Sequence, residues 1–189
     1  GQESRLSDAF TVTEAGCPVR TVDVAGECVG ARRVFLSSSE SNAGFGDVTG
    51  ADTVCQDLAD GAELGGTWLA WIAQSGATAP DTRLEQAAVP YYRLDGTVVA
   101  DDWTDLVDGT LQNPISLTET LETFDNAEVW TGSSAGGGST GDDCADWTNT
   151  SGAMPFGTVG NSGRTDSTWS DVFPQFCDRT NVRLYCVEQ

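Results

Sequence analysis

Residues 48–72 read VTGADTVCQDLADGAELGGTWLAWI, and the rest of the chain is organised around this stretch. Apolar or small side chains recur at a helical period along one side, at Ala51, Val54, Cys55, Leu58 and Ala62. Thr49 precedes an acidic first turn and predicts the start of the helix, and Gly65 and Gly66 predict its end. Residues 68–72 are almost continuously apolar, which is typical of a strand buried on both faces. The stretch therefore predicts a helix followed by a buried strand, with Cys55 on the inner face of the helix.

The composition bounds the size and class of the protein. A chain of 189 residues favours one compact domain with a short extension. A hydrophobic content of 39% and six tryptophans are enough to form a core. Twenty-two glycines and only 20% charged residues predict many turns and short strands rather than a helical bundle.

The charge is strongly acidic, with 29 Asp and Glu against nine Arg and a formal net charge of −20. Nucleic-acid binding is disfavoured because it needs a basic patch, and anionic membrane surfaces are disfavoured for the same reason. Two explanations of the charge stay open. One is solubility in a salty or extracellular medium, and the other is a set of carboxylates that converge on Ca²⁺.

The residue types that are absent exclude several kinds of chemistry. The chain has no histidine, which excludes Ser-His-Asp catalysis and zinc sites with histidine ligands. It has no lysine, which excludes Schiff-base catalysis. We therefore expect no zinc, no catalytic residues and no enzymatic activity.

Six cysteines form an even set without a CxxC pair, which predicts three structural disulfides and not a zinc ribbon. No signal peptide and no run of 18 apolar residues is present, so we expect a mature protein that does not insert into a membrane. The expected location is extracellular or on the cell surface, in an oxidising compartment.

Three regions are expected along the chain. Residues 1–16 are polar with little periodicity and are interpreted as an N-terminal extension. Residues 17–31 begin with CPVRTVDVAGEC, which predicts a small hairpin closed by a local disulfide between Cys17 and Cys28. Residues 32–189 form the main domain. Its other expected elements are strands at 33–37, 144–147, 157–159 and 183–187, a short helix at 83–88, a hairpin at 91–100, a helical turn at 103–109 and an exposed loop at 131–143.

This order of parts resembles the C-type-lectin-like fold in its long form, and within it the endostatin-like branch. Similar bacterial surface domains of unassigned function resemble the chain more closely still. The resemblance covers residues 32–189 and rests on the segments GADTVCQDLADGAELGGTWLAWIAQ, RLEQAAVPYYRLDG, VWTGSSAGG, CADW and RLYCVEQ. It implies an α+β fold with one main disulfide-anchored helix, short antiparallel sheets and long loops. It also implies the disulfides Cys55–Cys186 and Cys144–Cys177, besides the local Cys17–Cys28.

Two departures limit what the resemblance carries over. Endostatins bind zinc through histidines and heparin through clustered arginines, and neither feature is present here. Calcium-dependent lectins carry an acidic pair before the first inner cysteine and a Trp-Asn-Asp triplet before the second. In this chain Asp142 and Asp143 precede Cys144, and Trp169-Ser170-Asp171 precedes Cys177, with serine in place of the asparagine ligand. The resulting candidate Ca²⁺ ligands are Asp142, Asp143, Ser170 and Asp171, and the alternative is that these acids are simply solvated.

Two functions from different classes follow as hypotheses. The first is an extracellular binding or adhesion module that recognises a carbohydrate or protein ligand through residues 131–143 and 161–175. Trp147 and Trp169 lie near these loops and are the candidate ligand-contacting side chains. The second is a structural subunit of a surface assembly or filament, in which residues 1–16 contact a neighbouring copy.

Overall fold

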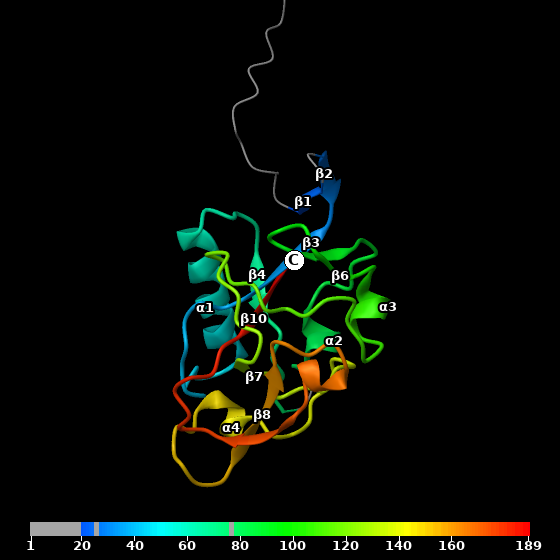
Figure 1. Cartoon of the computed structure of the whole chain (residues 1–189). Coiled ribbons are helices and arrows are strands. Elements are labelled where there is room, and N and C mark those ends of the chain that lie inside the picture. The colour runs from blue at the N-terminus through cyan, green and yellow to red at the C-terminus, as the bar shows by residue number, and fades with distance from the viewer. Residues whose placement is uncertain (1–19, 25–26, 76–77) are drawn as a thin grey trace, which may run out of the picture.

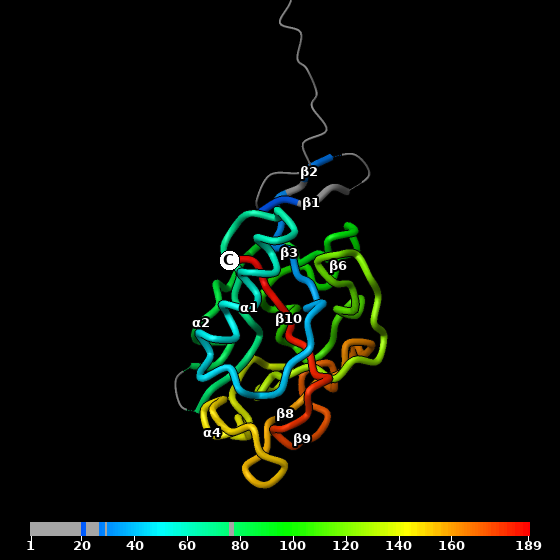
Figure 2. The backbone as a smooth tube through the Cα atoms, turned by 90° about the vertical axis from the view of Figure 1, so that its left-hand side faces the viewer, coloured from blue at the N-terminus to red at the C-terminus, as the bar shows by residue number. Residues whose placement is uncertain are grey.

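The computed structural model describes residues 20–24, 27–75 and 78–189 (Figures 1 and 2). Within these ranges the fold is α+β, with four α-helices and with two-stranded, five-stranded and three-stranded sheets. The elements are β1 (Thr21–Val24), β2 (Glu27–Gly30), β3 (Arg32–Leu36), α1 (Val48–Gly61), β4 (Trp68–Ala70), α2 (Pro80–Arg83), β5 (Tyr91–Arg93), β6 (Val98–Ala100), α3 (Trp103–Leu106), β7 (Glu128–Trp130), α4 (Cys144–Trp147), β8 (Phe156–Asn161), the 3-10 helix η1 (Ser167–Trp169), β9 (Phe173–Phe176) and β10 (Tyr185–Glu188).

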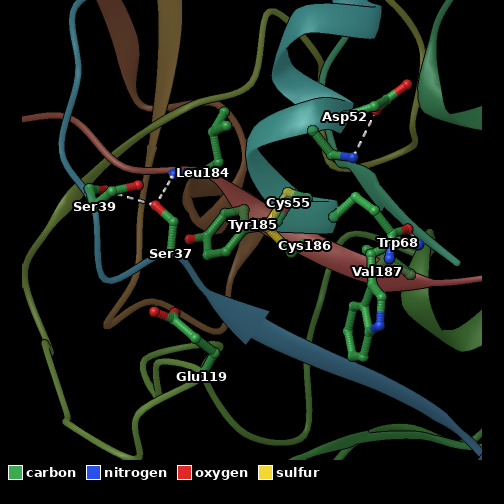
Figure 3. The surroundings of a disulfide bond; sticks show 12 residues. Ser37, Ser39, Asp52, Cys55, Trp68, Glu119, Leu184, Tyr185, Cys186 and Val187 are labelled. Carbon is green, nitrogen blue, oxygen red and sulfur yellow. Dashed lines mark hydrogen bonds between the residues drawn. A yellow bond between two sulfur atoms is a disulfide. The ribbon is translucent and has the colours of Figure 1, made fainter. Parts of the chain in front are cut away.

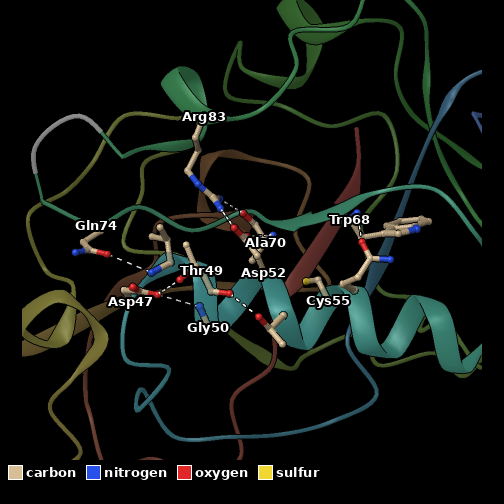
Figure 4. Close-up of polar contacts among 12 residues, drawn as sticks. Asp47, Thr49, Gly50, Asp52, Cys55, Trp68, Ala70, Gln74 and Arg83 are labelled. Carbon is tan, nitrogen blue, oxygen red and sulfur yellow. Dashed lines mark hydrogen bonds and ion pairs between the residues drawn. The ribbon is translucent and has the colours of Figure 1, made fainter.

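Helix α1 begins one residue earlier than the sequence predicted, and its N-cap is Asp47 (Figure 4). The Asp47 carboxylate accepts a hydrogen bond from the Gly50 backbone N–H at 3.0 Å, and the Thr49 hydroxyl donates to the same oxygen. A carboxylate caps a helix N-terminus more favourably than a threonine hydroxyl, so the prediction of Thr49 as the start was wrong. Thr49 instead supports the cap.

The inner face of α1 packs against β4 and anchors it. Val48, Ala51, Cys55 and Ala59 are its buried residues. On the same helix, the Asp52 carboxylate accepts a hydrogen bond from the Ala70 backbone N–H at 2.9 Å and forms an ion pair with Arg83 (Figure 4). The helix and the apolar strand predicted from residues 48–72 are therefore confirmed, and polar contacts join them to α2.

The five-stranded sheet has the order β4-β10-β3-β5-β6 and brings the two ends of the main domain together. β10 pairs antiparallel with both β3 and β4, and β3 pairs parallel with β5. The predicted hairpin at 91–100 is confirmed as β5 and β6. Since β10 lies between β3 and β4, the sheet cannot be completed until this late strand has been added.

Two disulfides hold the described part of the domain. Cys55 on α1 is bonded to Cys186 on β10, with a sequence separation of 131 (Figure 3). Cys144 is bonded to Cys177, with a separation of 33. These are the pairings that the resemblance implied. Cys17 lies outside the described residues, and with it the expected pairing to Cys28.

The predicted strand at 144–147 is wrong, because these four residues form the left-handed turn α4. Their φ angles lie between 53° and 59°, although none of them is glycine. Left-handed backbone costs about 1–2 kcal/mol per such residue, so the surroundings have to stabilise it. Asp143 supplies one contact, because its carboxylate accepts a hydrogen bond from the Asp146 N–H at 3.1 Å. The disulfide of Cys144 and the burial of Trp147 supply the others.

The predicted helix at 83–88 is also wrong, because the helix in this region, α2, spans Pro80–Arg83 and ends where the predicted one begins. Pro80 occupies the first turn, where its missing N–H costs no hydrogen bond. Leu84 has extended backbone angles and ends the helix. Pro80 was the sequence signal for the start of this helix.

The hairpin β1–β2 lies at one end of the molecule, and α4 and β8 lie at the other (Figures 1 and 2). The carboxylate of a buried ion pair between β3 and β10 also holds Arg20, the residue before the hairpin. The Glu188 carboxylate is fully buried, accepts two hydrogen bonds from the Arg33 guanidinium at 2.7 and 2.8 Å, and accepts a third from the Arg20 backbone N–H at 2.7 Å. The expected extension at 1–16 lies outside the described residues.

Candidate functional site

A hollow of about 450 Å³ opens where three distant segments of the chain meet. The first segment contributes Glu40, the second contributes residues 124–128, and the third contributes Asn181 and Arg183. The hollow combines one aromatic ring with several carboxylate and amide side chains. Such a mixture of apolar surface and convergent polar groups is typical of small-ligand sites.

Arg183 forms the fixed base of the hollow and is not free to bind a ligand. Its guanidinium donates to the backbone carbonyl oxygens of Ser37 and Ser38 at 2.8 and 2.6 Å, and to the Glu40 carboxylate at 2.8 Å. The guanidinium carbon lies 3.9 Å from the centroid of the Phe124 ring, in a cation–π contact. Only 5% of the Arg183 side chain is exposed. Arg183 therefore positions Glu40 and Phe124.

The wall formed by residues 124–127 is held closely against β8 and the turn that follows it. The Ser162 hydroxyl donates to the carbonyl oxygen of Phe124 and accepts from the Ala127 N–H at 2.9 Å. A Cβ atom on Gly163 would lie 1.6 Å from the carbonyl oxygen of Asp125, so only glycine fits there. The wall is therefore held by the Ser162 hydroxyl and by close backbone packing at Gly163.

Asp125, Asn126 and Asn181 carry the side chains that a ligand can reach. All three are exposed, and within the described part of the chain their side chains form no hydrogen bond or ion pair. Glu128 also faces the hollow, but Gln175 donates to it at 3.2 Å and Arg179 lies 3.8 Å away. The charge of Glu40 is balanced by Arg183, and the charge of Glu128 is balanced by Arg179. The charge of Asp125 is not balanced, so the hollow is net negative.

The candidate Ca²⁺ ligands are only partly available in the structure. Asp143 is buried, and its second carboxylate oxygen accepts from the Ser75 N–H at 2.7 Å. The Ser170 hydroxyl accepts from the Trp71 indole N–H at 3.0 Å and donates to the Ser133 carbonyl oxygen at 2.9 Å. Asp171 is exposed and Asp142 is half-buried. Across residues 20–24, 27–75 and 78–189, no group of three or more Asp, Glu, Cys or His side chains is arranged to hold a metal ion.

Trp147 and Trp169, the candidate ligand-contacting side chains, present no exposed surface to a ligand. Both are fully buried. The Trp147 indole N–H donates to the Ala73 carbonyl oxygen at 2.8 Å, and the Trp169 ring packs on Trp71 with centroids 4.8 Å apart. The polar loops around both tryptophans suggested exposure, but the loops fold over them.

The loop at 131–143 is likewise more buried than the sequence predicted. Thr131 and Ser133 are fully buried, and the Thr131 hydroxyl donates to the Ser170 carbonyl oxygen at 2.6 Å. Gly132 has a φ of +55° and lies against the Ala73 carbonyl oxygen and the Trp147 ring. The glycine- and serine-rich composition therefore serves close packing at residues 131–133, while residues 139–141 stay exposed.

The sequence reasoning missed the residues of the hollow. Arg183 carried the one available signal, because an arginine at the head of an apolar closing strand needs a buried acidic or carbonyl partner. Nothing in the sequence connects it to Phe124 or Glu40, which are distant along the chain. The juxtaposition arises from the fold alone.

These features define a disulfide-linked α+β domain with a polar hollow. Two disulfides fit an oxidising or extracellular compartment. No helix in the ranges that the structure describes is long and apolar enough to span a bilayer.

Residues 38–165, about two thirds of the chain, match the family described as protein of unknown function DUF1554. The chain therefore belongs to this family. A comparison with curated proteins found no match.

Proposed function

We propose that the protein is an extracellular binding or adhesion module of C-type-lectin-like fold, and that the hollow beside Arg183 receives its ligand. The support for the fold is the helix-to-last-strand disulfide, the inner disulfide and the adjacent first and last strands. The observation that carries the function is the rigid hollow with three unengaged polar side chains at its surface. The proposed role is recognition without catalysis.

The polar groups favour a carbohydrate ligand that is neutral or carries an amine. Asp125 accepts hydrogen bonds, while Asn126 and Asn181 both donate and accept them, which suits adjacent sugar hydroxyls. Sulfated or carboxylated sugars are disfavoured, because the hollow carries net negative charge and its arginine is already engaged. Part of the Phe124 ring and Ala127 supply apolar surface for the C–H face of a sugar ring.

A glycan array followed by calorimetry tests this proposal. We expect neutral or amine-bearing glycans to bind, and Asp125→Asn and Asn181→Ala each to weaken binding by about tenfold, the value of one lost hydrogen bond to a charged or well-placed group. Asp57→Asn, on the exposed face of α1, is the matched control and should bind like the wild type. Binding confined to acidic glycans, or equal loss in the control, would contradict the proposal.

Calcium is a separate part of the hypothesis and has its own test. Asp171 is the one exposed carboxylate among the four candidate ligands. Calorimetric titration with Ca²⁺ should give heat for the wild type and less for Asp171→Ala. Absence of heat from both proteins would remove calcium from the proposal while leaving the hollow untouched.

The second candidate function is a structural subunit of a surface assembly. The observation that favours it is the position of the β1–β2 hairpin at one end of the molecule (Figure 1). A segment that leaves from this end can contact the opposite end of another copy, which generates an open chain of subunits. Deleting residues 1–16 should abolish assembly without unfolding the domain. An unchanged monomer before and after deletion would count against this function.

A further inference from the structure

Three of the eight residues that line the hollow carry carboxylates, namely Glu40, Asp125 and Glu128. Among the described residues that line it, only Arg183 is basic, and its guanidinium is already engaged with two backbone carbonyl oxygens and with Glu40. Within the same ranges, Asp125 has no hydrogen-bond or ion-pair partner, and the second carboxylate oxygen of Glu40 has none either. The hollow therefore offers a ligand negative charge and acceptor oxygens, with no free cation among its lining residues.

The cation beside Glu128 is held only loosely. The Nη2 atom of Arg179 lies 3.8 Å from the Oε2 atom of Glu128, which is longer than a hydrogen bond, and the Arg179 side chain is 45% exposed. Gln175 holds Glu128 independently, because its side-chain amide lies within hydrogen-bond distance of both carboxylate oxygens, at 3.4 and 3.2 Å. Arg179 can therefore move away while Glu128 keeps its place in the hollow.

The two arginines that balance the acids of the hollow differ in how easily they are replaced. Arg183 is 5% exposed and lies 2.8 Å from Glu40, so its charge is a fixed part of the structure. Arg179 is not a lining residue, and its exposed ion pair with Glu128 contributes little stability because water screens it. A cation that enters the hollow from solution meets the charge of Asp125 and competes with Arg179 for Glu128.

We propose that the hollow selects ligands that carry an ammonium group, in the first place sugars with a free amine, and that Arg179 limits how tightly they bind. This inference rests on the proposed function and names the ligand class of the same site. The ligand ammonium takes the place of Arg179 beside Glu128, and the guanidinium moves into solvent. Arg179 thus weakens the binding of cations and leaves the binding of neutral sugars unchanged, so it is a specificity-determining residue.

Calorimetry with a matched pair of oligosaccharides tests this inference. The probes are an oligomer of β-1,4-linked glucosamine and its fully N-acetylated counterpart, which has the same sugar backbone without the positive charge. Both are titrated into the full chain at pH 6, and we expect the amine form to bind at least about tenfold more tightly. Arg179→Gln should tighten the binding of the amine form by about two- to fivefold, the value of one exposed ion pair, and leave the acetylated form unchanged. Arg20→Gln removes an arginine from an exposed ion pair that does not line the hollow, and this control should change neither affinity.

A Glu128→Gln background separates the proposed role of Arg179 from a structural one. In that background Arg179→Gln should no longer change the affinity for the amine form, because the two residues act as a pair. Thermal melts establish that the variants are folded, which the exposure of Arg179 leads us to expect.

Three results would overturn the inference. Equal affinity for the two oligomers would refute the selection of amines and would leave the hollow as a site for neutral glycans. Arg179→Gln binding the amine form no more tightly than the wild type, or no more tightly than Arg20→Gln, would refute the role of Arg179. If neither oligomer binds, the inference is wrong, and the glycan array decides separately whether the proposed function is wrong as well.

Discussion

Replacing Glu188 by leucine should be among the most destabilising single changes in the domain. The Glu188 side chain is fully buried and Arg33 is 7% exposed, so neither charge is solvated. Removing the carboxylate leaves the Arg33 guanidinium with the carbonyl oxygen of Leu64 at 3.0 Å and a cation–π contact with Trp68 at 5.2 Å. Breaking a buried ion pair in this way costs about 3–5 kcal/mol.

The backbone adds to this cost. The N–H groups of Arg33 and Arg20 both donate to Glu188, at 3.2 and 2.7 Å, and both lose their acceptor. Arg20 is exposed, so water can replace its acceptor, while Arg33 is buried and water cannot. An unsatisfied buried N–H costs about 1–3 kcal/mol, so we expect the total to lie toward the upper end of the range for the ion pair.

Urea unfolding of the oxidised protein, followed by tryptophan fluorescence, measures the effect. The variants are Glu188→Leu, Arg33→Leu and the combination of the two. The combination should cost less than Glu188→Leu alone, because it leaves no unpaired buried charge. Arg20→Leu is the control, since the Arg20–Glu85 pair is exposed on both sides, at 56% and 48%, and exposed pairs contribute about 0–1 kcal/mol.

Two results would refute this reasoning. One is a loss of less than about 1 kcal/mol for Glu188→Leu, which would show that the charge is not isolated from water. The other is a double variant whose loss equals the sum of the single losses, because additivity means that the two residues do not interact.

Three further predictions follow from other parts of the fold. Replacing Cys55 and Cys186 together by alanine should cost about 5 kcal/mol in urea unfolding, because their sequence separation is 131, and a loss below about 1 kcal/mol would exclude this role for the disulfide. Gly163→Ala should lower stability by about 1–3 kcal/mol and weaken glycan binding, since its Cβ would overlap the Asp125 carbonyl oxygen; an unchanged melt would contradict the geometry. The hydrogen bond from the Thr49 hydroxyl lowers the pKa of Asp47 below its ordinary value of 3.8, so its contribution to stability is present above that pH and lost as the pH falls through the lowered pKa. Asp47→Ala should therefore destabilise the protein at pH 6 but hardly at pH 2, and an equal loss at both would contradict it.

The helix and strand of residues 48–72 were predictable because the signals for them are local. The helical period of residues 51–62, the glycines after it and the apolar run at 68–72 act within a few residues of one another. The missed details are those that depend on competing local groups, such as Asp47 against Thr49 as the cap. The disulfide from Cys55 to Cys186 required the resemblance, since spacing alone leaves the pairing of six cysteines open.

The second half of the chain was less predictable because its composition is ambiguous. Glycine, serine and threonine at 131–143 suit an exposed loop and a closely packed buried segment equally well. Tertiary contacts decide between them. The Thr131 hydroxyl donates to the Ser170 carbonyl oxygen at 2.6 Å, and the Ser133 hydroxyl shares a hydrogen bond with the Ser170 hydroxyl. These contacts satisfy the buried polar groups of the segment. The same effect buries Trp169, which the neighbouring polar loops had made a candidate ligand-contacting side chain.

The arginines explain how so acidic a chain holds a compact fold and what its surface can bind. Arg33, Arg83 and Arg183 are largely buried, and each joins segments that are far apart in the sequence through an acid and one or more backbone carbonyls. Because most of the positive charge is engaged in ion pairs, the exposed charge is mostly acidic, and the hollow shares that bias. The two kinds of glycan proposed for the hollow should therefore respond differently to salt. A neutral glycan makes short-range hydrogen bonds and should bind equally at low and high salt. A glycan that carries an amine should bind more weakly as salt rises, since the Debye length falls from about 10 Å at 0.1 M to about 3 Å at 1 M.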